Sequence, residues 1–365
     1  MRARIIFFTA LLAIAGCSKK DEVASLSDGY VFPPINIQCS YIAMLESDLA
    51  RNVLLIGEEA KKCAAFFDEI GIKSCTSPSG KIDLVIMSCK SISRQSCEKV
   101  SSFLNDNGSI AWMMDVSGVR AFEFRKMLED FNFADVRLWM VGQSRWLLTG
   151  SKRPRVKKLE DMFLLFSYEG VFERLAEAKC SALQHIFASY AGSRDDIMPA
   201  FSAGDLKATV RPEFFLTKEI PSLSWIDSSN VDEDIAKKFF AEARSMQVVR
   251  RLAVEGSMLA EAGNEKEAVD SWARAFKRNP LDIFILERLD RLDRNAKGFW
   301  EVRKVLMAMK CYETMVLINP EYEAALNNFG MCLKKIGRHD IAERAFKRVK
   351  ELQEKTQIST GGNKK

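Results

Sequence analysis

Asn52-Val-Leu-Leu-Ile-Gly57 is a short apolar run that ends in glycine, and it predicts the first buried strand of an α/β domain of the nucleotide-binding kind. Glu58 and Glu59 follow, where an active enzyme of this kind would have a glycine-rich loop. Glycines there let the backbone approach an anionic or nucleoside ligand, and the next helix N-terminus adds positive potential. Because two carboxylates oppose that potential, the segment predicts the fold and argues against a working ligand site.

Downstream of this strand, short apolar runs alternate with helical patterns. This alternation predicts parallel strands that are joined by crossover helices. Further strands are expected at residues 72–75, 82–87, 109–116, 136–141 and 145–149, and helices at 59–70, 93–105 and 119–131. The last two strands form a hairpin-like pair, so the order resembles the Rossmann-like methyltransferase class. The fold class expected for residues 36–228 is therefore α/β Rossmann-like.

Three stretches of this region resemble spermidine synthase-like proteins, which are bacterial relatives of the polyamine aminopropyltransferases. They are Arg137-Leu-Trp-Met-Val-Gly-Gln-Ser-Arg-Trp-Leu-Leu-Thr-Gly-Ser-Lys-Arg-Pro154, Asn107-Gly-Ser-Ile-Ala-Trp-Met-Met-Asp115 and Thr209-Val-Arg-Pro-Glu-Phe-Phe-Leu216. The first of them resembles the closing hairpin of that family, and the similarity covers about residues 50–225. The resemblance implies a transferase fold with sites for a nucleoside cofactor and an amine substrate.

The chain departs from this family at three places that the chemistry needs. The family ends its fourth strand with an aspartate that helps to deprotonate the attacking amine, whereas Asp83-Leu-Val-Ile-Met-Ser88 ends in a serine. A hydroxyl has too high a pKa to serve as this base unaided. The glycine loop is reduced to Gly57, and the acidic residue that holds the ribose hydroxyls is missing. The departures imply a degenerate, non-catalytic domain that has no cofactor.

Three carboxylates leave a second interpretation open, in which Glu58, Glu59 and Asp115 form an acidic pocket for a cationic polyamine. Carboxylates stabilise ammonium groups, so such a pocket is physically reasonable. The alternative is that Glu58 and Glu59 lie in the first turn of a helix, where the dipole favours acids by about 0.3–1 kcal/mol. Asp115 would then be a helix cap at the end of a strand. For the two glutamates we favour the helix-terminus explanation over the polyamine pocket.

The second half of the chain repeats itself, and the copies align on the proline that closes each unit. Residues 249–282 and 323–352 match well, while 289–322 keeps fewer positions after a six-residue insertion. The shared positions are Gly256, Leu259, Ala268, Trp272, Ala275 and Pro280, then Ala296, Ala308, Tyr312 and Pro320, then Leu326, Phe329, Gly330, Leu333, Gly337, Ala342 and Phe346. Small residues let paired helices approach, and large ones fill the space between units. The pattern resembles tetratricopeptide repeats and predicts an all-α domain over residues 232–355.

Residues 232–247 are expected to form a helix that precedes these repeats, packs on the first one and joins the two domains. Tetratricopeptide repeats bind extended or helical peptides along the concave face made by the first helix of each unit, so the resemblance implies a protein or peptide partner. The residues expected to face this groove are Arg250, Ser257, Glu261, Asn327, Asn328, Met331 and Lys334. The alternative is that these side chains are merely solvated, or that Asn328 has a structural role between repeats.

The first 17 residues have the pattern of a bacterial lipoprotein signal peptide. A cationic start precedes an apolar run of about eleven residues, which is too short to span a bilayer. Ile14-Ala-Gly-Cys17 resembles a lipobox whose cysteine is lipidated, and residues 18–35 are expected to be a tether. Ser18 resembles the pattern that is sorted to the outer membrane, so we expect a membrane-anchored protein on the periplasmic face. An ordinary signal peptide with a chance cysteine is the alternative.

Composition excludes some functions and leaves others open. The net charge is +5 with both signs interspersed, which gives no basis for nucleic-acid binding. Five of the eight cysteines after Cys17 fall within residues 39–97, so they form one or two disulfides or remain buried free thiols. No C-x-x-C is present and the chain has only two histidines, so no metal site is expected. The polar segment 356–365 is expected to be disordered.

Together these observations predict a lipid-anchored interaction or scaffold protein. The repeats would bind a protein partner, and the degenerate α/β domain would serve as a scaffold. Two alternatives remain: an active or altered polyamine aminopropyltransferase, and a protein that binds a polyamine without chemistry. The cofactors of the family are cytoplasmic metabolites, so export of the chain would separate an enzyme of this type from its supply.

Overall fold

The computed structural model describes residues 35–47, 50–78, 80–167, 170–177, 182–203, 206–212, 215 and 220–361. The expected signal peptide with Cys17, nearly all of the expected tether and the last residues of the chain lie outside this range. The chain divides into two compact units, and the division falls between Val254 and Glu255, inside helix α13 (Glu233–Glu261). Within the described residues, no helix is both long and apolar enough to cross a bilayer.

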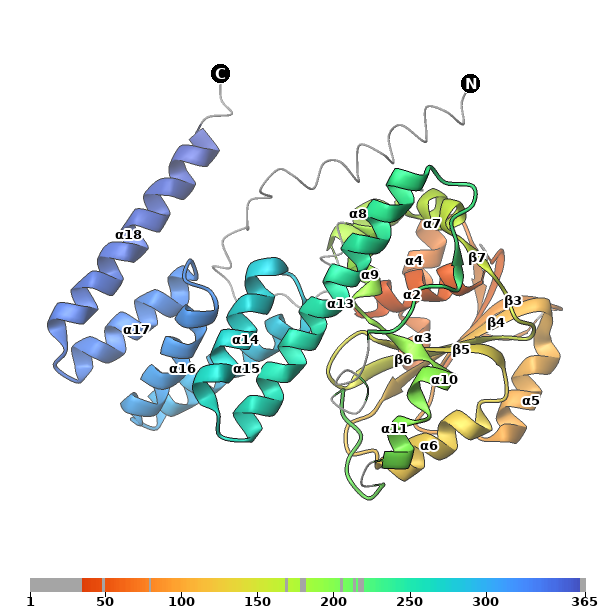
Figure 1. Cartoon of the computed structure of the whole chain (residues 1–365), viewed down its shortest axis with the longest axis horizontal. Helices are drawn as coiled ribbons and strands as arrows, with labels where there is room; N and C mark the ends of the chain where they lie inside the picture. Colours follow the sequence, from red (N-terminus) through yellow and green to blue (C-terminus); the bar gives the residue numbers. More distant parts are fainter. Residues whose placement is uncertain are drawn as a thin grey trace. The chain divides into compact units, whose positions relative to one another are not determined.

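The first unit contains a mixed sheet of seven strands in the order β2-β1-β3-β4-β6-β5-β8 (Figure 1). The strands are β1 (Asn52–Ile56), β2 (Lys73–Cys75), β3 (Ile82–Ser88), β4 (Leu104–Asp115), β5 (Ala134–Met140), β6 (Arg145–Ser151) and β8 (Tyr190–Ser193). Strands β1 to β4 pair in parallel, whereas β4–β6, β5–β6 and β5–β8 are antiparallel. The six predicted strands and the hairpin are confirmed, and β8 is an addition that the sequence analysis missed. Two short strands, β7 (Lys157–Lys158) and β9 (Ile226–Asp227), pair separately.

Alternate residues of each strand point to opposite sides of the sheet. Apolar side chains therefore lie on both faces, and helices cover both of them. On one face Leu55, Ile86 and Leu147 join a core shared with helices on that side. On the other face Trp112 stacks on Phe131, which directly follows α6. The first face is covered by α2 (Ile35–Glu46), α4 (Ala64–Glu69), α7 (Leu159–Phe166), α8 (Val171–Glu177) and α9 (Leu183–Phe187). Helices α5 (Arg94–Phe103) and α6 (Ala121–Asp130) are the crossovers predicted at 93–105 and 119–131.

Helix α2 was not predicted, although it lies at the centre of the unit against β3, β4 and β6. Its residues from Ile37 to Glu46 are all buried, so it has no polar face. An amphipathic period marks a helix only when one side meets water, and that period is absent here. The predicted helix 59–70 is present as two pieces, α3 (Glu58–Lys61) and α4.

The first half of α13 belongs to the core of the α/β unit. Phe239 is fully buried, and its ring meets the rings of Phe163 and Phe187 edge-on at 5.5 Å. The sequence analysis placed this helix on the first repeat. Its aromatic and small residues instead fill the core between α7 and α9, which corrects that expectation.

The second unit consists of paired helices from the end of α13 onward (Figure 1). They are α14 (Glu265–Arg278), α15 (Ile283–Glu301), α16 (Val305–Ile318), α17 (Glu323–Lys335) and α18 (His339–Gly361). The same turn joins the helices of each pair: the backbone N–H groups of Asn264, Lys304 and Arg338 donate to the carbonyl groups five residues earlier at 2.8, 2.8 and 2.9 Å. Three helix pairs in the described part of the chain therefore share one turn geometry. Helix α18 extends to Gly361, into the segment expected to be disordered.

Small and large residues meet between paired helices as the repeat pattern predicts. A Cβ added at Gly256 would lie 2.5 Å from Nε1 of Trp272, and one added at Gly330 would lie 2.7 Å from Cε1 of Phe346. Both glycines therefore allow a close helix approach that alanine would obstruct. The six-residue insertion before residue 289 forms the first turns of α15, which explains why the middle unit is longer than its neighbours.

Candidate functional site

Four of the six residues expected at a degenerate ligand site line a cavity of about 520 Å³ at the carboxyl ends of β1, β3 and β4. Glu58, Glu59, Ser88 and Asp115 all line it. In open α/β sheets ligands bind outside the carboxyl ends of the strands, where neighbouring connections diverge. The sequence analysis therefore placed four side chains around one real cavity.

Asp83 does not belong to this group, because it lies at the opposite end of β3. Its carboxylate accepts hydrogen bonds from the backbone N–H groups of Arg51 and Asn52 at 2.9 and 3.0 Å, and from the side chain of Asn105. These contacts join the starts of β1, β3 and β4. Asp83 is thus a structural residue, and its inclusion among the ligand-site positions is corrected.

Ser88 closes the end of the sheet where a ligand would approach the backbone. Its hydroxyl accepts a hydrogen bond from the backbone N–H of Ala60 at 3.1 Å, in the first turn of α3. Gly57 has a φ of +91°, and a Cβ there would lie 2.2 Å from the Ser88 carbonyl oxygen. Gly57 therefore permits contact between two strand ends, and one of the N–H groups in this turn is already occupied by Ser88.

Each carboxylate at the cavity has a basic partner. Glu58 pairs with Lys61 at 2.6 Å, Glu59 pairs with Lys62 at 2.7 Å, and both acids lie in the first turn of α3. The hydrogen bond from Lys61 lowers the pKa of Glu58. These pairs agree with the helix-terminus explanation of the two glutamates and leave little uncompensated negative charge for a polyamine.

Asp115 also has a basic partner, and it does not cap a helix. Its carboxylate accepts the backbone N–H of Ser117 at 2.9 Å and lies 3.7 Å from Nε of Arg145. Partial burial opposes ionisation, yet the bonds from Ser117 and the charge of Arg145 together lower the pKa of Asp115. Among the cavity-lining residues, Glu58, Glu59 and Asp115 are balanced in number by Lys62, Lys90 and Arg145.

A second candidate site lies on α17, where Asn327, Met331 and Lys334 recur at helical spacing along one face. All three side chains are exposed, and the Asn327 amide lies 3.9 Å from the Met331 sulfur. Asn328 is half-buried beside Tyr312 of α16: burial raises the pKa of Tyr312 to about 12, and the Asn328 hydrogen bond opposes that rise. This contact agrees with the alternative, a structural role for Asn328 between repeats.

Arg250 was expected in the groove, and the structure places it elsewhere. It is 3% exposed, and its guanidinium donates to the Met140 carbonyl at 2.7 Å. This bond ties α13 to the end of β5, so a peptide cannot reach the side chain. Ser257 is half-exposed and Glu261 exposed on the same helix.

Sequence reasoning missed the corresponding face of α15, since the insertion disturbed the alignment of the middle repeat. Trp300 near the end of α15 is half-buried, and the Lys335 ammonium of α17 lies 4.6 Å from its ring centroid. Lys297 is exposed one turn earlier and pairs with Asp293 at 2.6 Å. The contact between Trp300 and Lys335 shows that α15 and α17, the first helices of two successive units, are neighbours.

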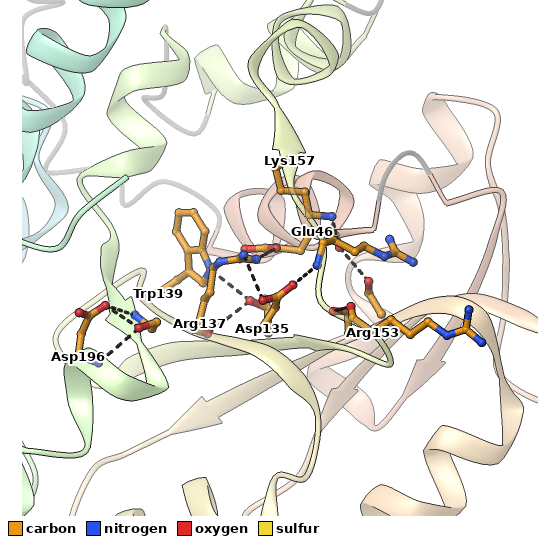
Figure 2. A network of polar contacts seen from close by, with 12 residues as sticks. Glu46, Asp135, Arg137, Trp139, Arg153, Lys157 and Asp196 are labelled. Atoms are coloured by element: carbon orange, nitrogen blue, oxygen red, sulfur yellow. Dashed lines mark hydrogen bonds and ion pairs between the residues drawn. The ribbon is translucent and has the colours of Figure 1, made fainter. Parts of the chain in front are cut away.

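A buried polar network in the α/β unit was also not predicted from the sequence (Figure 2). Arg137 of β5 and Glu46 of α2 are 4% and 5% exposed and form an ion pair of 2.6 Å. The Arg137 guanidinium lies 4.1 Å from the Trp225 ring centroid, and Lys157 Nζ donates to the Glu46 carbonyl at 2.8 Å. These contacts join α2, β5 and β7, and the network is structural.

Seven cysteines in the part of the chain that the structure describes are free thiols that form no disulfide: Cys39, Cys63, Cys75, Cys89, Cys97, Cys311 and Cys332. In that same part, no three side chains of histidine, cysteine, aspartate or glutamate come together as metal ligands.

Comparison with known proteins gives one informative relative. The chain is 31% identical over 97 residues to "Tetratricopeptide repeat protein 33" of Xenopus laevis, a match that covers 27% of this chain and 35% of the relative. No family model matches the chain, and no solved structure matches it. The chain thus spans about a third of the relative's length. The similarity agrees with the helical repeats of the second unit.

Proposed function

We propose that this chain is an interaction protein whose tetratricopeptide-like unit binds a peptide segment of a partner along α15 and α17. The observation that supports this most is the pairing of Gly256 with Trp272 and of Gly330 with Phe346, because it reproduces the small-to-large packing of the repeat. A stack of such pairs presents its first helices on one side, and exposed polar side chains there can bind a peptide backbone.

The binding face consists of Lys297 and Trp300 on α15 with Asn327, Met331 and Lys334 on α17. An amide, a thioether and an ammonium group along one helix face offer hydrogen bonds, apolar contact and charge to an extended chain. Aromatic and methionine side chains are favoured in interfaces, where their apolar area is large. This face therefore suits a peptide that has both apolar and acidic residues.

We further propose that the α/β unit is a non-catalytic, Rossmann-like relative of spermidine synthase-like proteins. Three observations support this. Ser88 stands where that family has its aspartate, Gly57 is held against Ser88, and each carboxylate at the cavity is paired with a cation. Isothermal titration of the full chain with spermidine, putrescine and 5′-methylthioadenosine tests the proposal. We expect no heat of binding from any of them, and binding of the nucleoside would refute it.

A lipid anchor at Cys17 completes the proposed arrangement and rests on the lipobox-like sequence alone. In a bacterial host, a radiolabelled fatty acid should be incorporated into the wild-type chain and not into Cys17→Ser. Equal labelling of the two proteins would exclude this anchor. Neither result bears on the peptide-binding face.

The binding proposal is tested with a partner isolated on the wild-type full chain. Asn327→Ala combined with Lys334→Glu should weaken the affinity for that partner at least tenfold, because both groups lie on the proposed face. Arg344→Glu changes an exposed charge on α18 and should leave the affinity unchanged. Equal loss in both variants, or loss in neither, would place the binding surface elsewhere.

A further inference from the structure

The cavity in the α/β unit has an unusual concentration of sulfur on its wall. Four of its fourteen lining residues are cysteine or methionine, namely Cys39, Cys89, Met113 and Met114. The whole chain has 9 cysteines and 15 methionines among 365 residues, so a wall of this size would hold about one by chance. Cys63 adds a fifth sulfur behind the wall, 4.0 Å from the sulfur of Met113.

Three of these sulfurs come from separate elements and lie on or behind one wall of the cavity. Cys39 lies on α2, Cys63 directly precedes α4, and Met113 lies on β4. The Cys63 thiol lies 3.7 Å from the carbonyl oxygen of Asn36, one turn before Cys39 on α2. Cys39 and Cys63 are 1% and 0% exposed, so neither thiol is in contact with bulk water.

The geometry points to a binding site for a soft monovalent metal ion, copper(I), formed by Cys39, Cys63 and Met113. Thiolate and thioether sulfurs are the ligands that copper(I) prefers over carboxylates and amides. A metal ion about 2.3 Å from each of three sulfurs in a plane holds those sulfurs about 4 Å apart. The separation of 4.0 Å between the Cys63 and Met113 sulfurs matches the spacing that such an ion needs for one of its three sulfur pairs.

The charge balance of binding can be followed atom by atom. Both buried cysteines are neutral thiols at neutral pH in the metal-free protein. When copper(I) binds, each thiol releases one proton to solvent, and two thiolates and one thioether surround a single positive charge. The site then has one net negative charge. Arg145 lines the same cavity and acts electrostatically on Cys39, where it offsets that charge.

This inference goes beyond the proposed function and does not depend on the helical repeats. Its test uses the full chain, reduced and free of oxygen, with copper(I) supplied as its bathocuproine disulfonate complex. We expect the protein to withdraw one copper ion from the chelator. No withdrawal of copper would overturn the proposal.

Variants assign the ligands. Cys63→Ser and Met113→Leu should each weaken copper binding at least tenfold, and the second exchange keeps the shape of an apolar side chain. Cys97→Ser removes another buried thiol, one that does not line the cavity, and should bind copper as the wild type does. Equal binding by all of these variants would exclude the site.

X-ray absorption of the wild-type complex gives a result that no variant's folding can obscure. We expect three sulfur neighbours around copper and no nitrogen or oxygen neighbour. A shell made of nitrogen or oxygen would refute the assignment.

Discussion

Gly57 and Ser88 are in contact so close that a Cβ on residue 57 would lie 2.2 Å from the Ser88 carbonyl oxygen and 2.5 Å from its hydroxyl. The ends of β1 and β3 are therefore held together at the cavity, where a glycine-rich loop would let a ligand approach the backbone. Three features lie here. Gly57 has a φ of +91°, the Ser88 hydroxyl accepts a hydrogen bond from the Ala60 N–H, and two glutamates each form an ion pair with a lysine.

The first prediction concerns this contact. Gly57→Ala should lower the free energy of unfolding by about 3 kcal/mol, because it adds a steric clash to an unfavourable positive φ. Gly71→Ala is the matched control, since Gly71 also has a positive φ but has nothing within 4 Å of the added Cβ. Its cost should be about 1 kcal/mol. Urea denaturation measures both, and equal costs would show that the contact with Ser88 is unimportant.

The second prediction concerns the helical repeats. Gly330→Ala should destabilise the chain by about 1–3 kcal/mol, since the new methyl group would overlap the Phe346 ring. Gly298→Ala in α15 meets open space and should instead stabilise it by about 0.5–1 kcal/mol, as alanine favours a helix. Thermal unfolding followed by circular dichroism distinguishes the two signs. If Gly330→Ala were also stabilising, the close packing of α17 on α18 would be disproved.

The third prediction concerns the buried ion pair of Figure 2. Arg137→Met should cost about 3–5 kcal/mol, because it leaves the Glu46 carboxylate buried without its partner. Adding Glu46→Gln to that variant should recover part of the loss, since a neutral amide is easier to bury. The exposed pair of Arg94 and Glu98 provides the control, and Arg94→Met should change stability by less than about 1 kcal/mol.

The fourth prediction concerns alkaline pH. Burial raises the pKa of Cys63 to about 11, above the ordinary cysteine value near 8.5. Between these values the folded chain holds a proton that the unfolded chain has lost, so stability falls as the pH rises through this window. The loss should be about 2–3 kcal/mol by pH 11 and should be smaller in Cys63→Ala. Urea denaturation at pH 7.5, 9 and 10.5 measures it, and parallel pH profiles would contradict the burial of this thiol.

Sequence periodicity was sufficient for most of the sheet. Each of the six predicted strands is a short apolar run, such as residues 52–57, and the runs could be located from the sequence alone. Helix α2 and strand β8 gave no such pattern. Helix α2 is buried on all sides, and β8 is a four-residue edge strand paired with β5.

The site residues could be predicted only where their place at the end of a strand fixes their position. Glu58, Glu59, Ser88 and Asp115 follow strand ends, and parallel strands bring those ends together. Asp83 and Arg250 were misplaced because their partners are distant in sequence. Asp83 binds the start of β1, and Arg250 donates to a carbonyl 110 residues away. No pattern in one sequence marks such pairs.

Site-specific photo-crosslinking tests the central claim, that a partner peptide binds along α15 and α17. A photoreactive phenylalanine replaces Met331 or Lys297 on the proposed face, or Arg344 on the second helix of the last pair, in the full chain. The account predicts that one and the same partner is crosslinked from residues 331 and 297 and not from residue 344. Crosslinking from residue 344 alone, or equal crosslinking from all three positions, would contradict it.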